Sequence, residues 1–93
     1  MSEERFQTLH PQEGKVNKNI ALDKYIFIKS HLLDILAESE LSHLELMEEL
    51  FSRVNGKFIG GVQWYGETVK LDLEARQIIE RTSGKPQKYK LKS

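Results

Sequence analysis

Cationic side chains gather toward the end of the chain. Residues 81–93 contain no Asp or Glu, and their five cations are Arg81, Lys85, Lys88, Lys90 and Lys92. Lysine and arginine neutralise phosphates, which gives an affinity for nucleic acid that is independent of sequence and falls steeply with salt. Lysines that alternate along a strand also prevent pairing with the strands of other molecules. The pattern therefore predicts either a phosphate-binding segment or a solvated strand edge.

The charge of the whole chain argues against strong binding to nucleic acid. The formal net charge is zero, whereas nucleic-acid-binding domains often have an isoelectric point above about 9. The charge is unevenly distributed, because residues 1–56 carry ten acids against six cations and residues 57–93 carry eight cations against four acids. We expect this polarity to draw an anionic partner to the C-terminal part.

No group of residues has the spacing of a catalytic or metal site. Cysteine is absent, and His10, His31 and His43 do not stand at metal-ligand spacings. Ser30 and His31 are adjacent on a predicted helix and point apart, so they form no catalytic pair. The glycines match no phosphate-binding loop. We therefore expect no enzymatic activity, no metal, no cofactor and no small-molecule substrate.

Residues 62–76 are predicted to form a helix that is apolar on two sides. The side expected to face the core recurs at helical spacing and comprises Val62, Tyr65, Val69 and Leu73. Trp64 and Leu71 form a second strip, because adjacent helical residues diverge by about 100°. If that strip is open, Trp64 is an aromatic anchor of the kind on which protein interfaces concentrate binding energy. Otherwise the indole packs beneath the C-terminal strands or the loop at residues 56–61.

Polar residues of the same predicted helix are candidates for contacts with nucleic acid. Gln63, Thr68 and Lys70 are of types that reach base edges or phosphates. Glu67 and Glu74 lie on the same helix and would repel phosphates. Nucleic-acid recognition and protein interaction therefore both remain open for this helix.

The elements before this helix are predicted from periodicity. Residues 1–19 show no helical period and are expected to form an extended N-terminal arm, followed by one domain over residues 20–93. Residues 22–39 are the first helix, with Phe27 in the middle of its polar face. Either the arm covers that ring, or a partner does, or it is a singly exposed ring. A homodimer through Phe27 or Trp64 is one version of the second case.

A second helix is predicted to begin with a capping box, in which Ser42 and Glu45 each accept a hydrogen bond from the other's backbone N–H. Asn55 and Gly56 are expected to end it, because both tolerate the left-handed conformation. Its predicted core stripe is Leu44, Met47, Leu50, Phe51 and Val54.

The chain ends in a predicted hairpin. Residues 78–82 and 88–91 are short runs of β-favouring residues, joined by a segment that contains Gly84 and Pro86. Residues 40–41 are a candidate third strand. The predicted fold class is therefore α+β and mainly helical, with a three-helix core and a C-terminal antiparallel β-hairpin.

This order of elements resembles the winged-helix superfamily, and residues 69–81 resemble the run from its third helix into the first strand of its wing. The resemblance implies a third helix in the major groove of duplex DNA and a wing on the backbone. Gln77 stands where that superfamily commonly has Gly, which predicts a less sharp or slightly strained bend. The stretches Leu9-His10-Pro11 and Gly61-Val62-Gln63-Trp64-Tyr65 are similar to those of small bacterial winged-helix-like proteins of unknown function.

Together these observations predict a non-catalytic binding module. Duplex DNA is the first expected partner, and a second copy or another protein is the alternative. The N-terminus has no apolar run typical of a signal peptide, and the longest apolar stretch, residues 25–28, is too short to cross a bilayer. We therefore expect a cytoplasmic protein without a membrane partner.

Overall fold

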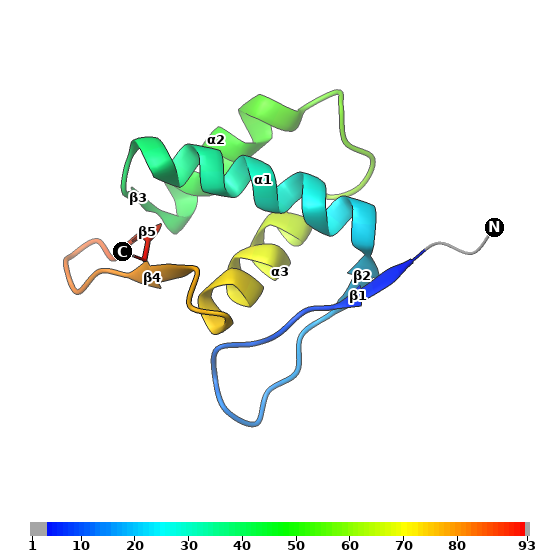
Figure 1. Ribbon diagram of the computed structural model, residues 1–93. Helices are drawn as coiled ribbons and strands as arrows, with labels where there is room; N and C mark the ends of the chain where they lie inside the picture. Colours follow the sequence, from blue (N-terminus) through cyan, green and yellow to red (C-terminus); the bar gives the residue numbers. More distant parts are fainter. Residues whose placement is uncertain (1–3, 93) are drawn as a thin grey trace.

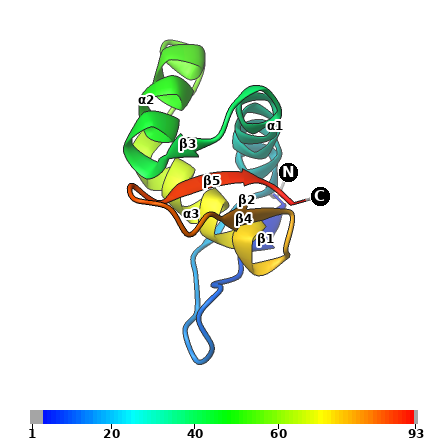
Figure 2. The same ribbon diagram turned by 90° about the vertical axis from the view of Figure 1, so that its left-hand side faces the viewer.

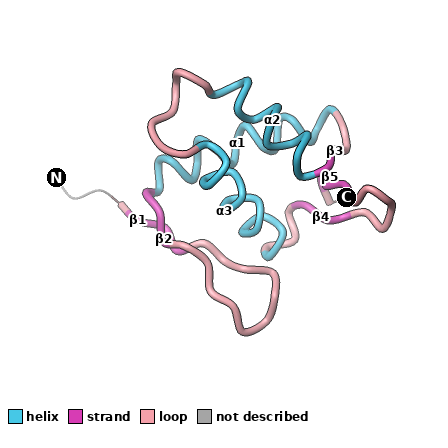
Figure 3. Tube along the Cα trace, turned by 180° about the vertical axis from the view of Figure 1, so that it is seen from behind, coloured by secondary structure: helices cyan, strands magenta, loops and turns pink. Residues whose placement is uncertain are grey.

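The computed structural model describes residues 4–92, and about half of the chain is helical. The three helices are α1 (Leu22–Glu38), α2 (His43–Val54) and α3 (Val62–Ala75). Figure 1 shows α1 and α2 lying over α3, and the three helices contact one another pairwise. Two small antiparallel sheets lie at opposite ends of this helical layer (Figures 1 and 3). The predicted α+β class is confirmed.

The first sheet is an N-terminal hairpin. Strand β1 (Arg5–Gln7) pairs with β2 (Asn19–Ala21), and the backbone N–H of Thr8 donates to the carbonyl of Lys18 over 3.1 Å. Thr8 is buried, with only 1 % of its surface exposed. The predicted extended arm is therefore folded back on itself, and the predicted boundary between residues 19 and 20 falls within β2. The reason is that the backbone N–H and C=O groups of this segment form hydrogen bonds with one another. The helical spacing of apolar residues gives no information about such strand pairing.

The second sheet has three strands in the order β3-β5-β4. Strands β4 (Ile79–Arg81) and β5 (Lys88–Leu91) form an antiparallel hairpin, and β3 (Leu41–Ser42) pairs with the other edge of β5, as Figure 2 shows. Ile79 and Tyr89 are buried against the helices. Because side chains alternate along a strand, Lys88 and Lys90 point to the opposite face.

Local end signals place α2 where the sequence predicted it. The hydroxyl of Ser42 accepts from the backbone N–H of Glu45 over 3.2 Å, and the Glu45 carboxylate accepts from the N–H of Ser42 over 3.0 Å. Gly56 takes a positive φ of 83° just after the helix. The predicted capping box and the predicted helix end are both confirmed.

The buried side of α2 differs from the predicted stripe. Leu44 and Phe51 are 63 % and 49 % exposed. The residues that face the core are Leu46, Met47, Leu50 and Val54. At 100° per residue, Leu44 and Phe51 lie about 100–120° around the helix from Leu50, so the rotation of α2 against its neighbours leaves them outside.

Phe27 is covered from within the chain. Its ring stacks on that of Phe58 at 5.8 Å between centroids, and the His31 ring meets it edge-on at 4.7 Å. Phe58 comes from the loop between α2 and α3 and also contacts the Tyr65 ring at 5.1 Å. Neither the N-terminal segment nor a partner is needed to cover Phe27, which was predicted as an interface residue.

The end of α3 is held in a left-handed turn by a residue other than glycine. Gln77 has φ of 62°, the N–H of Gln77 donates to the carbonyl of Glu74, and the N–H of Ile78 donates to that of Leu73. This pair of hydrogen bonds is the Schellman motif, in which glycine is the favoured residue. Of the two alternatives predicted at Gln77, a less sharp or a slightly strained bend, the positive φ agrees with the strained one.

We predict that Gln77→Gly raises the free energy of unfolding by about 0.5–1 kcal/mol, because glycine adopts a positive φ without the steric cost of a Cβ. Urea denaturation measures the change. Gln77→Ala is the matched control, since it also removes the side chain that accepts from Lys92 but keeps the Cβ. Equal stability of the Gly and Ala variants would contradict the prediction.

Candidate functional site

A hollow of about 320 Å³ opens between α3 and the loop at residues 8–18. Its apolar lining comes from Val16, Trp64 and Leu71, of which Val16 is 90 % and Trp64 47 % exposed. The charged and polar residues that line it are His10, Lys15, Asn17, Lys18, Glu67 and Thr68. We call this the Trp64 hollow. It brings together two of the predicted interface residues, Trp64 and Leu71.

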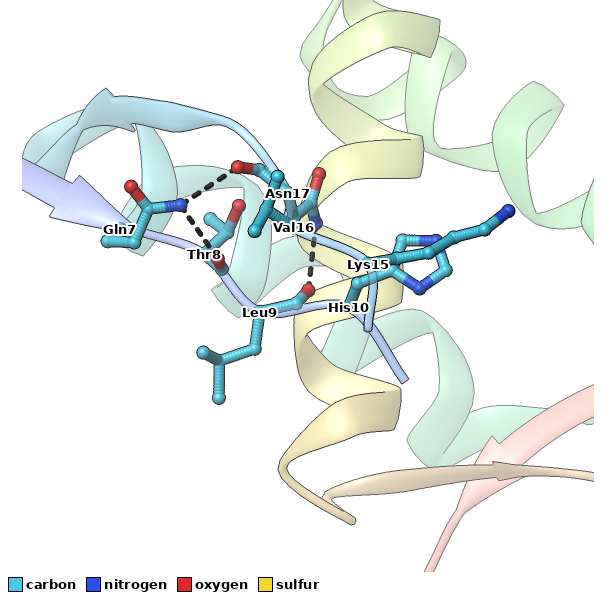
Figure 4. Close-up of a pocket in the computed structure, with 7 residues that line it drawn as sticks. All are labelled: Gln7, Thr8, Leu9, His10, Lys15, Val16 and Asn17. Carbon is cyan, nitrogen blue, oxygen red and sulfur yellow. Dashed lines mark hydrogen bonds between the residues drawn. The ribbon is translucent and has the colours of Figure 1, made fainter. Parts of the chain in front are cut away.

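The loop that forms one wall of the Trp64 hollow is fixed by side-chain amides. The Asn17 amide donates to the carbonyls of Leu9 and Thr68 over 2.9 and 3.0 Å, so it joins the loop to α3. The Gln7 amide donates to the carbonyl of Asn17 over 2.8 Å, and Figure 4 shows this bond together with the bond from Asn17 to Leu9. These bonds join the loop both to itself and to α3.

A buried carboxylate fixes the same loop a second time. Asp72 on α3 is fully buried and accepts from the backbone N–H of Leu9 over 2.8 Å, from the Arg76 guanidinium over 2.9 Å and from the Tyr25 hydroxyl. Burial, together with the hydrogen bond to Asp72, raises the pKa of Tyr25, so its hydroxyl remains a donor. Asp72 therefore links the N-terminal segment, α1 and α3.

The C-terminal hairpin keeps some of its cations free and engages others. Lys85 is exposed in the turn, and Lys88 and Lys90 lie on the outer face of β5, where Lys90 pairs in register with Glu80. The Lys92 ammonium donates to the Gln77 amide over 2.8 Å. Of these three lysines of the predicted set, Lys85 is therefore exposed, and Lys88 and Lys90 are partly exposed.

Arg81, also predicted to contact phosphate, is bound within the chain. Its guanidinium holds the Glu74 carboxylate through two nitrogens, which raises the pKa of Arg81, and it lies 5.5 Å from the centre of the Tyr89 ring. A phosphate would have to compete with Glu74 for this group.

Two of the three α3 residues that were predicted to contact nucleic acid have buried side chains. Gln63 is exposed, but Thr68 and Lys70 are each only 4 % exposed. The helix turns both toward α2 and the loop rather than toward solvent, so neither side chain can reach a groove of DNA. This corrects the predicted role of Thr68 and Lys70.

The ammonium of Lys70 lies in a pocket of neutral acceptors. It is 2.9 Å from Nδ1 of His43 and 3.0 Å from the Tyr89 hydroxyl, and it lies 4.1 Å from the centre of the Tyr89 ring. Burial, followed by repulsion from the Lys70 ammonium, lowers the pKa of His43, while Glu67 opposes the shift. The neutral imidazole is thereby favoured at the first turn of α2.

We predict that stability falls as the pH is lowered through about 6.5, the ordinary pKa of histidine. Because the pKa of His43 is lowered on folding, the unfolded chain binds more protons in that range and is favoured by acid. Denaturation in guanidinium at pH 7.5 and pH 5.5 measures the difference. His43→Gln keeps an acceptor for Lys70 and should reduce the difference; an unchanged pH dependence in that variant would refute the assignment to His43.

Comparison with known families gives one match. Residues 5–89 match the family of unknown function DUF6958. The chain belongs to this family. The match runs from the start of β1 to the middle of β5, and it includes every residue that lines the Trp64 hollow. No curated protein and no solved structure gave a significant match.

Neither a metal-ligand cluster nor a membrane-spanning helix is found within residues 4–92. That part of the chain contains no group of three or more potential metal-ligating side chains, His or acidic. None of its helices has the length and apolar character required to cross a bilayer.

The polar residues that organise the DUF6958 site were not predicted from the sequence. Asp72 lies three residues after Val69 and directly before Leu73, which places an acid on the apolar side of α3. That position was the available signal that Asp72 is buried and paired. Asn17 and Thr8 gave no such signal, because their partners are the Thr68 carbonyl in α3 and the Lys18 carbonyl at the other end of the 8–18 loop.

Proposed function

We propose that this DUF6958 chain is a winged-helix-like binding module that docks a segment of another protein in the Trp64 hollow. The order of α1, β3, α2 and α3 before the β4–β5 hairpin supports the winged-helix part of the proposal. The observation that carries the docking part is the half-exposed indole of Trp64, which shares one hollow with Val16 and Leu71.

The charges at the hollow define the chemistry of the partner. Lys15, Lys18 and His10 line it against a single acid, Glu67. Apolar anchors surrounded by polar groups that exclude water are where interfaces concentrate binding energy. The segment that fits has an aliphatic or aromatic side chain flanked by Asp or Glu, and charge complementarity speeds its encounter with the hollow.

Selection of displayed peptides on the immobilised chain tests this proposal. We expect enriched peptides to carry an apolar residue between acids, and to shift the emission of Trp64, the one tryptophan of the sequence. Calorimetry on Trp64→Ala should show an affinity at least roughly tenfold lower than that of the parent. The control is Ile26→Ser, which removes an equally exposed apolar residue outside the hollow. Peptides that bind Trp64→Ala as well as the parent would refute the proposal, as would a stable dimer through Trp64.

A second candidate is binding of duplex DNA by the C-terminal hairpin, favoured by the lysines on the outer face of β5 and by Lys85. If the hairpin makes three phosphate contacts, its affinity for DNA should fall roughly 40-fold when the salt concentration is raised from 50 to 200 mM. Fluorescence anisotropy of a labelled duplex should show this dependence, and the triple change of Lys85, Lys88 and Lys90 to Glu should abolish binding. The same triple change at Lys15, Lys18 and Lys57 is the charge-matched control. Equal loss in both variants, or no binding by the parent at low salt, would exclude this candidate.

A further inference from the structure

The outer face of α2 carries two apolar side chains at the spacing of a helix-pairing seam. Leu44 and Phe51 are both exposed and stand seven residues apart, so they lie within about 20° of each other around the helix. Glu48 lies between them and is exposed as well. We call these three residues the α2 outer face. The buried side of the helix, centred near Leu50, lies about 100–120° around the helix from Leu44 and Phe51.

Further acids surround the α2 outer face. Glu45 is exposed beside it, and the hydrogen bond from the backbone N–H of Ser42 lowers the pKa of Glu45, so its carboxylate stays ionised. Glu49, by contrast, is held by the Arg53 guanidinium at 3.0 Å. Lys88 also lies close enough to Glu45 to lower its pKa, but Glu45 and Glu48 together outnumber this cation, so the charge presented around Leu44 and Phe51 is negative.

The position of Glu48 decides against a second copy of this chain as the occupant. Glu48 is next to the midpoint of the seam between Leu44 and Phe51. Two copies that paired their seams about a two-fold axis would bring their Glu48 carboxylates together in either helix direction. Like charges at the centre of an interface oppose association.

We propose that the α2 outer face docks an amphipathic helix of another protein, with apolar residues seven positions apart and Lys or Arg between and beside them. The apolar residues of that helix would pack on Leu44 and Phe51, and its cations would pair with Glu48 and Glu45. Two apolar anchors make a small interface, so the complex is a transient one. This surface is separate from the Trp64 hollow, and the two proposals stand or fall independently.

The test uses two synthetic helical peptides that have leucines seven positions apart and differ only in flanking Lys or flanking Glu. Amide chemical shifts of the ¹⁵N-labelled chain are followed during titration. We expect the Lys peptide to bind and to perturb residues 43–55, and the Glu peptide to bind at least roughly tenfold more weakly. Phe51→Ser should abolish binding of the Lys peptide, and Ile26→Ser on α1 should not. Circular dichroism establishes that both variants are folded.

Charge reversal separates this proposal from nonspecific apolar contact. Glu48→Lys should exchange the preference, so that the Glu peptide becomes the tighter ligand. Equal binding of both peptides, binding of neither, or an unchanged preference in Glu48→Lys would overturn the proposal. Sedimentation that showed a dimer dissociated by Phe51→Ser would overturn it too, because the face would then be a self-interface.

Discussion

Asp72→Ala is expected to lower the free energy of unfolding by about 2–5 kcal/mol, because each buried donor left without an acceptor costs about 1–3 kcal/mol. The substitution leaves the Tyr25 hydroxyl, the Leu9 N–H and the Arg76 guanidinium without their acceptor. Domains of this size are stable by only about 5–15 kcal/mol, so the loss is a large share of the total. Urea denaturation measures it, and hydrogen exchange at the Leu9 amide should become faster.

Two control variants give the Asp72 prediction its specificity. Asp72→Asn keeps an oxygen acceptor of similar shape and should lose less stability than Asp72→Ala. Glu67→Ala removes an exposed carboxylate from the same helix and should change stability by no more than about 0.5 kcal/mol. If Asp72→Ala costs as little as Glu67→Ala, the carboxylate does not link the three elements.

Phe58→Ala is expected to cost about 2–3 kcal/mol, somewhat less than truncation of a fully buried phenylalanine. The ring is half-buried and lies against Phe27, Tyr65 and the ammonium of Lys24. Its removal leaves Phe27 open to water and takes away two aromatic contacts. Chemical denaturation measures the loss.

The matched control for Phe58→Ala is Phe51→Ala. Phe51 is the same residue type but is 49 % exposed on α2, so its truncation should cost less than about 1 kcal/mol. Similar losses at Phe58 and Phe51 would show that the loop after α2 does not contribute to the core.

Features set by local rules were predictable from the sequence, and features set by distant partners were not. The capping box at Ser42 and the helix end at Gly56 depend on neighbouring residues, so spacing alone identified them. The roles of Asp72 depend on Tyr25 and Leu9, which are 47 and 63 positions away. No local pattern encodes such a meeting.

The candidate site shows the same division. Trp64 and Leu71 share one strip of a helix, and helical geometry was sufficient to group them. The second wall of their hollow comes from the loop at residues 8–18, which has no period. In α2 the chain has more apolar residues than one face can bury, and only the packing of α2 on α1 and α3 decides that Leu44 and Phe51 remain outside.

The double attachment of the 8–18 loop, through Asn17 to the Thr68 carbonyl and through Leu9 to Asp72, determines how shortened chains behave. A truncation that begins at residue 22 would not trim a dispensable tail. It would expose the Asp72 carboxylate, uncover the Tyr25 ring, whose centroid lies 4.1 Å from that of Phe6, and remove one side of the Trp64 hollow. Recombinant fragments of this domain should therefore retain their first strand, because without it both the folding yield and the Trp64 hollow will be lost.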